Sequence, residues 1–322
     1  MPSRRFLQLD VFSPYPGAGN PLAVVLDGEG LDDATMQAIA RWTGLPETTF
    51  VFPATTPDAD YRLRMFSPQA EVPFAGHPSV GTAYAAIEAG IAAPRNGTAF
   101  GKHVRQEGIA GIFPLRIDDE DGKQSIAIRS PRAKIAEATT HADPRLADAT
   151  RGWGFGALPP VLMDGGRRWW LLEVASEATL RAIRPDWDAI AKLAEATGSM
   201  GVFAYARSDA GQAAPGRNVD FAVRAFVGNG RRFEDAASGA ANAVFAAWLD
   251  ERGALPHAAA ADGSRRFVVS QGREAGFDAQ LSLLVDADGE VWSGGQVRTL
   301  IRGEIDWQPG GTRDENRVVP SP

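Results

Sequence analysis

The feature that most constrains the fold of this chain is an internal repeat. Over residues 31–90, the spacing of apolar and turn-forming residues predicts a helix, two strands, a Pro- and Gly-rich loop and a small-residue helix, in that order. The same order returns over residues 187–249, where Arg224-Ala-Phe-Val-Gly corresponds to Arg64-Met-Phe-Ser-Pro. Two copies are too few for a solenoid. We therefore expect two pseudo-symmetric lobes that face each other across a cleft, a kind of interface where ligands bind.

Composition removes several classes of function. The chain has 322 residues, no cysteine and a net charge of −7, which excludes disulfides and cysteine chemistry and disfavours a nucleic-acid partner. No apolar run approaches the ~20 residues of a membrane span, and no secretory signal pattern is visible. The histidines, at 77, 103, 141 and 257, show no ligand spacing, and no Gly-rich phosphate fingerprint follows a strand. We expect a cytoplasmic protein that binds no membrane, nucleic acid, metal or cofactor.

The differences between the two halves indicate residues with a function of their own. Where equivalent positions match, the shared residue belongs to the scaffold; where they differ, one copy has specialised. Three pairs of positions carry a reactive side chain in one copy alone: Glu47 against Gly201, His77 against Ala240, and Asp235 against Val72.

Each of these side chains has a chemical and a structural interpretation. Glu47 begins a strand between apolar elements, where burial would raise its pKa toward neutrality. Alternatively, it is an ordinary exposed loop glutamate, and its position in the sequence alone favours this second interpretation. His77 precedes a helix whose backbone N–H groups can bind an anion, and it could contact that anion itself. Alternatively, it is a loop histidine whose hydrogen bonds are made with the backbone. Asp235 and Ser238 precede the matching helix and would be routine caps. The more specific signal is the pairing, since two helix N-termini can face one anionic ligand.

Several blocks occur together and in a fixed order over most of residues 6–305. They are Gly19-Asn-Pro-Leu-Ala-Val-Val, Leu45-Pro-Glu-Thr-Thr-Phe-Val, Arg64-Met-Phe-Ser-Pro, Glu71-Val-Pro-Phe-Ala-Gly-His-Pro, Glu234-Asp-Ala-Ala-Ser-Gly-Ala-Ala, Ser270-Gln-Gly and Val291-Trp-Ser-Gly-Gly-Gln-Val. Each block alone is common, whereas the combination resembles the PhzF phenazine-biosynthesis family. The resemblance implies an α+β fold of the diaminopimelate-epimerase type, with each lobe a curled, mostly antiparallel sheet around a central helix.

That fold assigns residues to the two lobes. The central helices would be the small-residue helices at 79–89 and 239–249. The N-terminal lobe would span residues 1–125, completed by a strand near 297–310, and the C-terminal lobe would span residues 126–296.

The resemblance also implies a function, the cofactor-independent isomerisation of a small carboxylic acid. The family's best-known reaction is a proton shift on a dihydro-hydroxyanthranilate, and its members are commonly homodimers. Glu47 takes the acid/base position here, and His77 and Asp235 contact the substrate or relay protons. The residues expected to bind the substrate are Asn20, Gly76, Ser238 and Gly239, the glycines through backbone N–H groups.

The chain departs from the family pattern around the expected ligand. Pro46 replaces a usual serine, Ala236 a proline, Ser238 a threonine, Ala240 a serine, and Gly276-Phe277 a Gly-Arg pair. With these changes we still expect a proton shift, but we do not extend the family's phenazine precursor to this chain as its substrate. Two alternatives stay open: a non-catalytic protein that binds small acids or partner proteins on the same scaffold, and a related epimerase or dehydratase.

Overall fold

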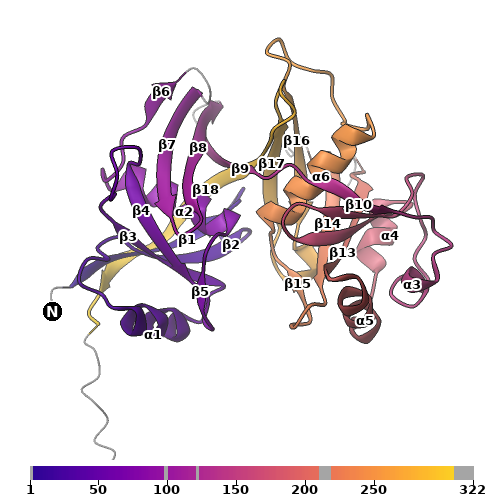
Figure 1. The fold of residues 1–322 in the computed structure, drawn as a ribbon, viewed down its shortest axis with the longest axis horizontal. Coiled ribbons are helices and arrows are strands. Elements are labelled where there is room, and N and C mark those ends of the chain that lie inside the picture. The colour runs from indigo at the N-terminus through magenta and orange to yellow at the C-terminus, as the bar shows by residue number, and fades with distance from the viewer. Residues whose placement is uncertain (1–2, 98–100, 121–122, 210–218, 308–322) are drawn as a thin grey trace, which may run out of the picture.

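The computed structural model describes residues 3–97, 101–120, 123–209 and 219–307, which form two lobes side by side (Figure 1). In the N-terminal lobe each strand of a ring pairs with the next, and the last pairs with the first. In ring order the strands are β1 (Arg4–Val11), β2 (Asn20–Val25), β3 (Glu47–Phe52), β4 (Tyr61–Phe66), β7 (Gly101–Gly108), β8 (Gly111–Glu120), β9 (Lys123–Ser130) and β18 (Val291–Ile305). The pairs β2–β3 and β4–β7 are parallel, and the other pairs of the ring are antiparallel.

The C-terminal lobe repeats this plan as a curled row of strands. In order of pairing they are β10 (Lys134–Ala138), β11 (Val161–Asp164), β12 (Arg168–Glu173), β13 (Ser199–Arg207), β14 (Phe221–Val227), β16 (Arg265–Gln271), β17 (Ala279–Val285) and the first half of β18. The parallel pairs β12–β13 and β14–β16 occupy the places of β2–β3 and β4–β7. The expected α+β class with two pseudo-symmetric lobes is confirmed.

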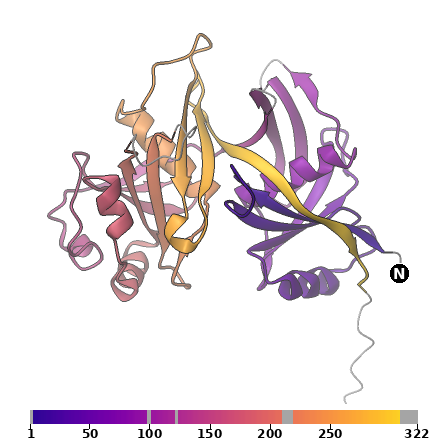
Figure 2. The ribbon, with the colours of Figure 1, turned by 180° about the vertical axis from the view of Figure 1, so that it is seen from behind.

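Strand β18 crosses between the lobes and joins them. Its first half lies between β17 of the C-terminal lobe and β9 of the N-terminal lobe. Its second half pairs with β1, from Val297 opposite Val11 to Ile305 opposite Arg4. Figure 2 shows β18 in yellow as it runs from one lobe into the other. The second half of β18 thus closes the N-terminal ring against β1, while the lobe boundaries at residues 125 and 296 stay a prediction.

One helix lies inside each curled sheet. Helix α2 (Gly76–Glu88) contacts β1, β2, β3, β9 and β18, and helix α6 (Gly239–Glu251) contacts β10, β11, β12, β17 and β18. All of residues 241–249 in α6 are buried, so strands cover this helix on every side. A helix in such a place is apolar around its circumference, and α6 combines small residues with the buried side chains of Phe245 and Trp248. The two helices also contact each other, at the boundary between the lobes.

The first central helix begins earlier than the sequence predicts. We expected a helix over residues 79–89, preceded by a loop that contains His77, but α2 begins at Gly76 and ends at Glu88. Pro78 does not prevent this start, because the first helical N–H groups have no intrahelical partner and proline loses nothing there. His77 is therefore the second residue of a helix, and its backbone is fixed by the helix geometry.

The outer elements complete the repeat. Helices α1 (Asp33–Thr43) and α5 (Trp187–Thr197) each begin after an aspartate cap, Asp32 or Asp186, and end at a left-handed glycine. The loop expected before the second small-residue helix contains the short strand β15 (Phe233–Asp235), which pairs with β14. The remaining elements are β5 (Glu71–Val72), β6 (Arg95–Gly97), α3 (Pro144–Ala147), α4 (Glu177–Ala182) and a 3-10 turn at Arg273–Ala275. Within the described ranges, no helix is both long and apolar enough to cross a bilayer.

Candidate active site

A cavity of about 600 Å³ lies between the lobes and is lined by residues of both. Every residue predicted for the site from the sequence lines it: Asn20, Glu47, Gly76, His77, Asp235, Ser238 and Gly239. The fold thus brings together side chains from β2, β3, β15 and the starts of α2 and α6, which are far apart in the chain.

The N-termini of the two central helices meet at this cavity. A Cβ atom built on Gly76 would lie 3.9 Å from the Cα of Gly239, so the first residues of α2 and α6 are almost in contact. At α6, the Ser238 hydroxyl accepts a hydrogen bond from the Ala241 N–H at 3.3 Å. At α2 the cap is Ala75, which has no side-chain acceptor. Two helix dipoles, and a start of α2 that no side chain caps, therefore make the cavity attractive to an anion.

Glu47 and His77 face each other within the N-terminal lobe. The Oε2 of Glu47 lies 3.4 Å from the Nε2 of His77, and both atoms are buried without a hydrogen bond to another described residue. Burial raises the pKa of Glu47 to about 7, assisted by the nearby Asp235 carboxylate and opposed by Arg167. Burial lowers the pKa of His77 to about 3, so its imidazole is neutral at pH 7. A carboxyl with a pKa near neutrality can both accept and donate a proton.

Asp235 enters the cavity from the C-terminal lobe. Its Oδ1 accepts a hydrogen bond from the Ala237 N–H at 3.2 Å. Burial raises the pKa of Asp235 to about 6, while the bonds to Ala237 and Ser238 and the charge of Arg167 act in the opposite direction. The cavity therefore contains two carboxyls, one from each lobe, that both titrate close to neutral pH.

Asn20 and Gln271 hold the loop between β15 and α6. The Asn20 Nδ2 donates to the Ala237 carbonyl at 3.0 Å and so connects the lobes, while its buried Oδ1 has no partner among the described residues. The Gln271 Oε1 accepts from the Ser238 N–H at 3.2 Å, and its Nε2 donates to the Asp235 carbonyl at 2.8 Å. In the sequence Gln271 stands in the Ser270-Gln-Gly block, and this block was the signal that could have placed it here.

Sequence reasoning also missed Arg167 and the apolar walls of the cavity. Arg167 lies in the turn between β11 and β12, and Phe74, Trp169 and Phe233 line the cavity with it. The other histidines lie outside the cavity lining; His257 Nε2, for example, is 2.7 Å from Asp220 Oδ1. Over the described residues, no group of three or more potential ligands could hold a metal ion.

The paired lobes with central helices define the class, a diaminopimelate-epimerase-like fold. The chain belongs to the PhzC-PhzF family, whose model, described as phenazine biosynthesis-like protein, matches residues 9–304. The resemblance seen in the sequence is confirmed, and so is the expected isomerase class, because relatives of this chain include named isomerases.

Two relatives and one solved structure illustrate the similarity. The chain is 30% identical over 312 residues to antisense-enhancing sequence 1 of Schizosaccharomyces pombe, covering 94% of this chain and 99% of that protein. It is 27% identical to trans-2,3-dihydro-3-hydroxyanthranilate isomerase of Pseudomonas aeruginosa, covering 91% and 94%. The crystal structure of a PhzF-family phenazine biosynthesis protein from Bacillus anthracis superposes with a TM-score of 0.77 at 24% identity, covering 95% and 100%, which shows the shared fold.

Proposed function

We propose that this protein isomerises a small carboxylic acid by moving one proton, with Glu47 as the acid/base. The observation that carries the proposal is the contact between Glu47 and His77. Two polar atoms 3.4 Å apart, buried and without another described partner, face a cavity that can hold a ligand. Buried polar atoms are nearly always paired, so such exceptions favour a role toward a substrate.

The reaction has two proton transfers. The Glu47 carboxylate takes a proton from an activated carbon, the C–H bond breaks, and its electron pair delocalises into the conjugated system of the substrate. The N–H groups at the starts of α2 and α6 stabilise the negative charge that develops. The same carboxyl then returns the proton to another carbon, where a new C–H bond forms and the electron pair is consumed. His77, neutral at pH 7, orients the carboxyl or the substrate, and Asp235 contacts the substrate from the other lobe.

A related reaction is a second candidate. Glu47 and Asp235 come from opposite lobes into one cavity, and the pKa of each carboxyl is raised, to about 7 and about 6. Two acid/base groups on opposite sides of a substrate are what an epimerase requires, because one removes the proton and the other delivers it to the opposite face. The isomerase is favoured by the relative whose name specifies a dihydro-hydroxyanthranilate as its substrate.

Deuterium incorporation tests the proposal directly. The protein is incubated in D₂O with a panel of small carboxylic acids that includes trans-2,3-dihydro-3-hydroxyanthranilate, and the products are analysed by mass spectrometry and NMR. Hydrogen at a new carbon supports isomerisation, either as deuterium where Glu47 exchanges with solvent or as the substrate's own proton where it does not, whereas deuterium at the original carbon with inverted configuration supports an epimerase. Binding without exchange and without a new product indicates the non-catalytic alternative.

Substitution of the acid/base gives the residue-level test. Glu47→Gln keeps the shape of the side chain and removes its proton chemistry, so exchange should fall by about 10²–10⁴-fold. Glu29→Gln, the same change at an exposed glutamate of the same lobe, is the matched control and should leave exchange unchanged. Full activity in the Glu47 variant would refute its role.

We also propose that the protein acts in the cytoplasm as a homodimer. Several large apolar side chains of the N-terminal lobe are exposed, among them Trp42, Leu300 and Ile301. A second copy packed against these side chains would remove their apolar surface from water. Light scattering coupled to size-exclusion chromatography measures the mass, and a monomer at micromolar concentration would contradict the dimer.

A further inference from the structure

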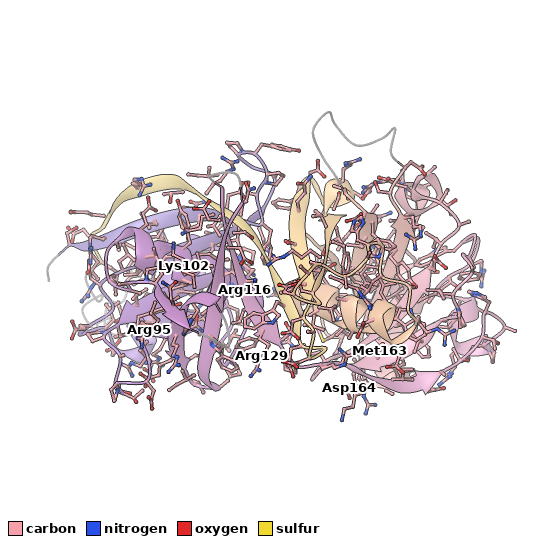
Figure 3. The ribbon with its side chains drawn as sticks, turned by 90° about the horizontal axis from the view of Figure 1, so that it is seen from above. Arg95, Lys102, Arg116, Arg129, Met163 and Asp164 are labelled. Carbon is pink, nitrogen blue, oxygen red and sulfur yellow. The ribbon has the colours of Figure 1, made fainter. Side chains whose placement is uncertain are left out.

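Two adjacent arginines, Arg167 in the turn between β11 and β12 and Arg168 at the start of β12, differ in their surroundings. Arg168 pairs back across the turn, with its Nε 3.0 Å from the Oδ2 of Asp164. Arg167 lines the cavity together with Gly165 and Gly166. Figure 3 labels Asp164, at the base of this turn, on the part of the C-terminal lobe nearer to the other lobe. The turn thus presents one paired guanidinium and one that faces the candidate site.

The position of the turn is fixed by close packing against α6. A Cβ atom on Gly165 would lie 2.8 Å from the Cγ2 of Val244 and 3.2 Å from the Cβ of Ala133, so only glycine allows this approach. Gly166 adopts a φ of +90°, which also favours glycine. Because the turn cannot move away from α6 without losing this contact, Arg167 extends from a defined point at the rim of the cavity.

Arg167 has no hydrogen-bond or ion-pair partner among the described residues, and it lines the same cavity as the two carboxyls. Among the residues that line the cavity, it alone has a positively charged side chain. Over the described part of the chain, its guanidinium has no hydrogen bond or ion pair, yet its charge lowers the pKa values of Glu47 and Asp235. A guanidinium with free N–H groups matches a carboxylate in two parallel hydrogen bonds.

Apolar side chains give the rest of the cavity its shape. Val72, Phe74, Trp169, Phe233, Val244 and Phe277 all line it. Such walls bind a flat or cyclic hydrocarbon body, while a few polar groups fix its orientation. The cavity therefore suits a ligand that is acidic at one end and apolar along its body.

We propose that Arg167 binds the substrate's carboxylate in a bidentate ion pair and so makes the enzyme specific for cyclic acids over their neutral analogues. The carboxylate lies at the rim, the ring lies against the apolar walls, and the reacting C–H bond is directed to Glu47. The orientation of the reacting C–H bond toward Glu47 rests on the proposed function. The preference for an acid over its neutral analogue does not require turnover.

Binding of an acid and its amide tests the proposal. The probes are 3-hydroxyanthranilate, a stable aromatic analogue of the dihydro acid named above, and its uncharged carboxamide, and their affinities are measured by calorimetry. The unmodified protein should bind the acid at least tenfold more tightly than the amide. Arg167→Gln should remove this preference by weakening the acid at least tenfold, and Arg168→Gln, which removes the same charge from the same turn, should retain it.

A second measurement does not depend on a ligand. Carbon-13 NMR titration of the carboxyl groups should show higher pKa values for Glu47 and Asp235 in Arg167→Gln and unchanged values in Arg168→Gln. Equal binding of acid and amide, failure of the unmodified protein to bind the acid at millimolar concentration, or equal losses in the two variants would each overturn the proposal. Glu47→Gln should keep the preference for the acid even though it loses exchange, so failure of the acid/base role is distinguishable from failure of the Arg167 site.

Discussion

The two lobes preserve the same polar contacts at equivalent places. In the N-terminal lobe, the Nε and Nη2 of Arg64 donate to the two carboxylate oxygens of Glu71, at 2.6 and 2.7 Å. In the C-terminal lobe, Arg224 donates to Glu234 in the same way, at 2.9 and 2.7 Å. Each pair ties a long strand to the short strand that leads to the central helix. A glutamine from the next strand also contacts the first turn of that helix in both lobes, Gln106 to Ser79 and Gln271 to Asn242.

The lobes differ where their surfaces reach the cavity. Glu47 begins β3, whereas the equivalent Gly201 in β13 has a φ of +146°, and a Cβ there would lie 2.0 Å from the Phe226 carbonyl oxygen. The second lobe therefore has no room for a carboxylate at this position and supplies Asp235 instead, where the first lobe has Val72. The comparison indicates that each copy of the duplicated scaffold contributes one carboxyl to the candidate site.

The largest effect should come from breaking one of the repeated ion pairs. The side chain of Arg224 is 3% exposed and that of Arg64 is 21% exposed. Arg224→Gln leaves Glu234 buried without its partner and also removes donors to the Leu180 and Ile183 carbonyls, so it should cost about 3–5 kcal/mol of unfolding free energy.

The matching change in the other lobe is the control. Arg64→Gln, in a more exposed pair, should cost about 1 kcal/mol. Urea denaturation measures both values. Because Glu234 directly precedes Asp235, the Arg224 variant should also disturb the candidate site more than the Arg64 variant does. Equal losses of unfolding free energy in Arg224→Gln and Arg64→Gln would mean that burial does not make one ion pair more stabilising than the other.

A smaller effect is expected from alanine at the two positions where the lobes differ. Gly201→Ala places a Cβ against the Phe226 carbonyl and strains the backbone, which should cost about 2–4 kcal/mol. Glu47→Ala removes a desolvated carboxyl and should cost little or nothing at pH 8. Thermal unfolding at pH 8 provides the comparison. If Gly201→Ala were neutral, the explanation of the asymmetry by backbone crowding would be wrong.

Much of this architecture could be predicted from the sequence because it depends on local patterns. The apolar spacing of the helix that ends at Thr43, the glycine that follows it and the alternation over Tyr61–Phe66 are short-range signals, and the repeat doubled each of them. The start of α2 was predicted too late, because Pro78 is a helix breaker by itself and is tolerated only through its place in the first turn.

Some residues of the candidate site could likewise be predicted from the sequence, and others could not. Glu47, His77 and Asp235 could be found because the repeat has different residues at their counterparts. Arg167 could not, because its neighbour Arg168 has the same charge and the two differ only in what the fold places beside them. The separation of 3.4 Å between Glu47 and His77 likewise depends on the meeting of β3 and α2, which no local pattern encodes.

The smallest effect, and the sharpest test of the division between the lobes, is the pH dependence of stability. The pKa of Glu47 is about 7 in the folded protein against 4.5 for the ordinary side chain, so the folded state binds the proton more tightly than the unfolded state does. The stability that this group contributes is complete below pH 4.5 and is lost as the pH rises to about 7. In Glu47→Gln the side chain cannot ionise, so this loss of stability with rising pH disappears. The variant should match the unmodified protein near pH 4.5 and exceed it by about 1–3 kcal/mol at pH 8, since one pKa unit corresponds to about 1.4 kcal/mol.

The exposed Glu29→Gln variant separates burial from the loss of a negative charge. It removes the same formal charge from the same lobe, so its stability relative to the unmodified protein should not change between pH 4.5 and pH 8. Chemical denaturation at several pH values gives the three curves. A Glu47→Gln curve parallel to that of the unmodified protein would mean that Glu47 is solvated in the folded state. It would then titrate as an ordinary surface carboxylate, and the first lobe would differ from the second only in sequence and not in the chemistry that it brings to the cavity.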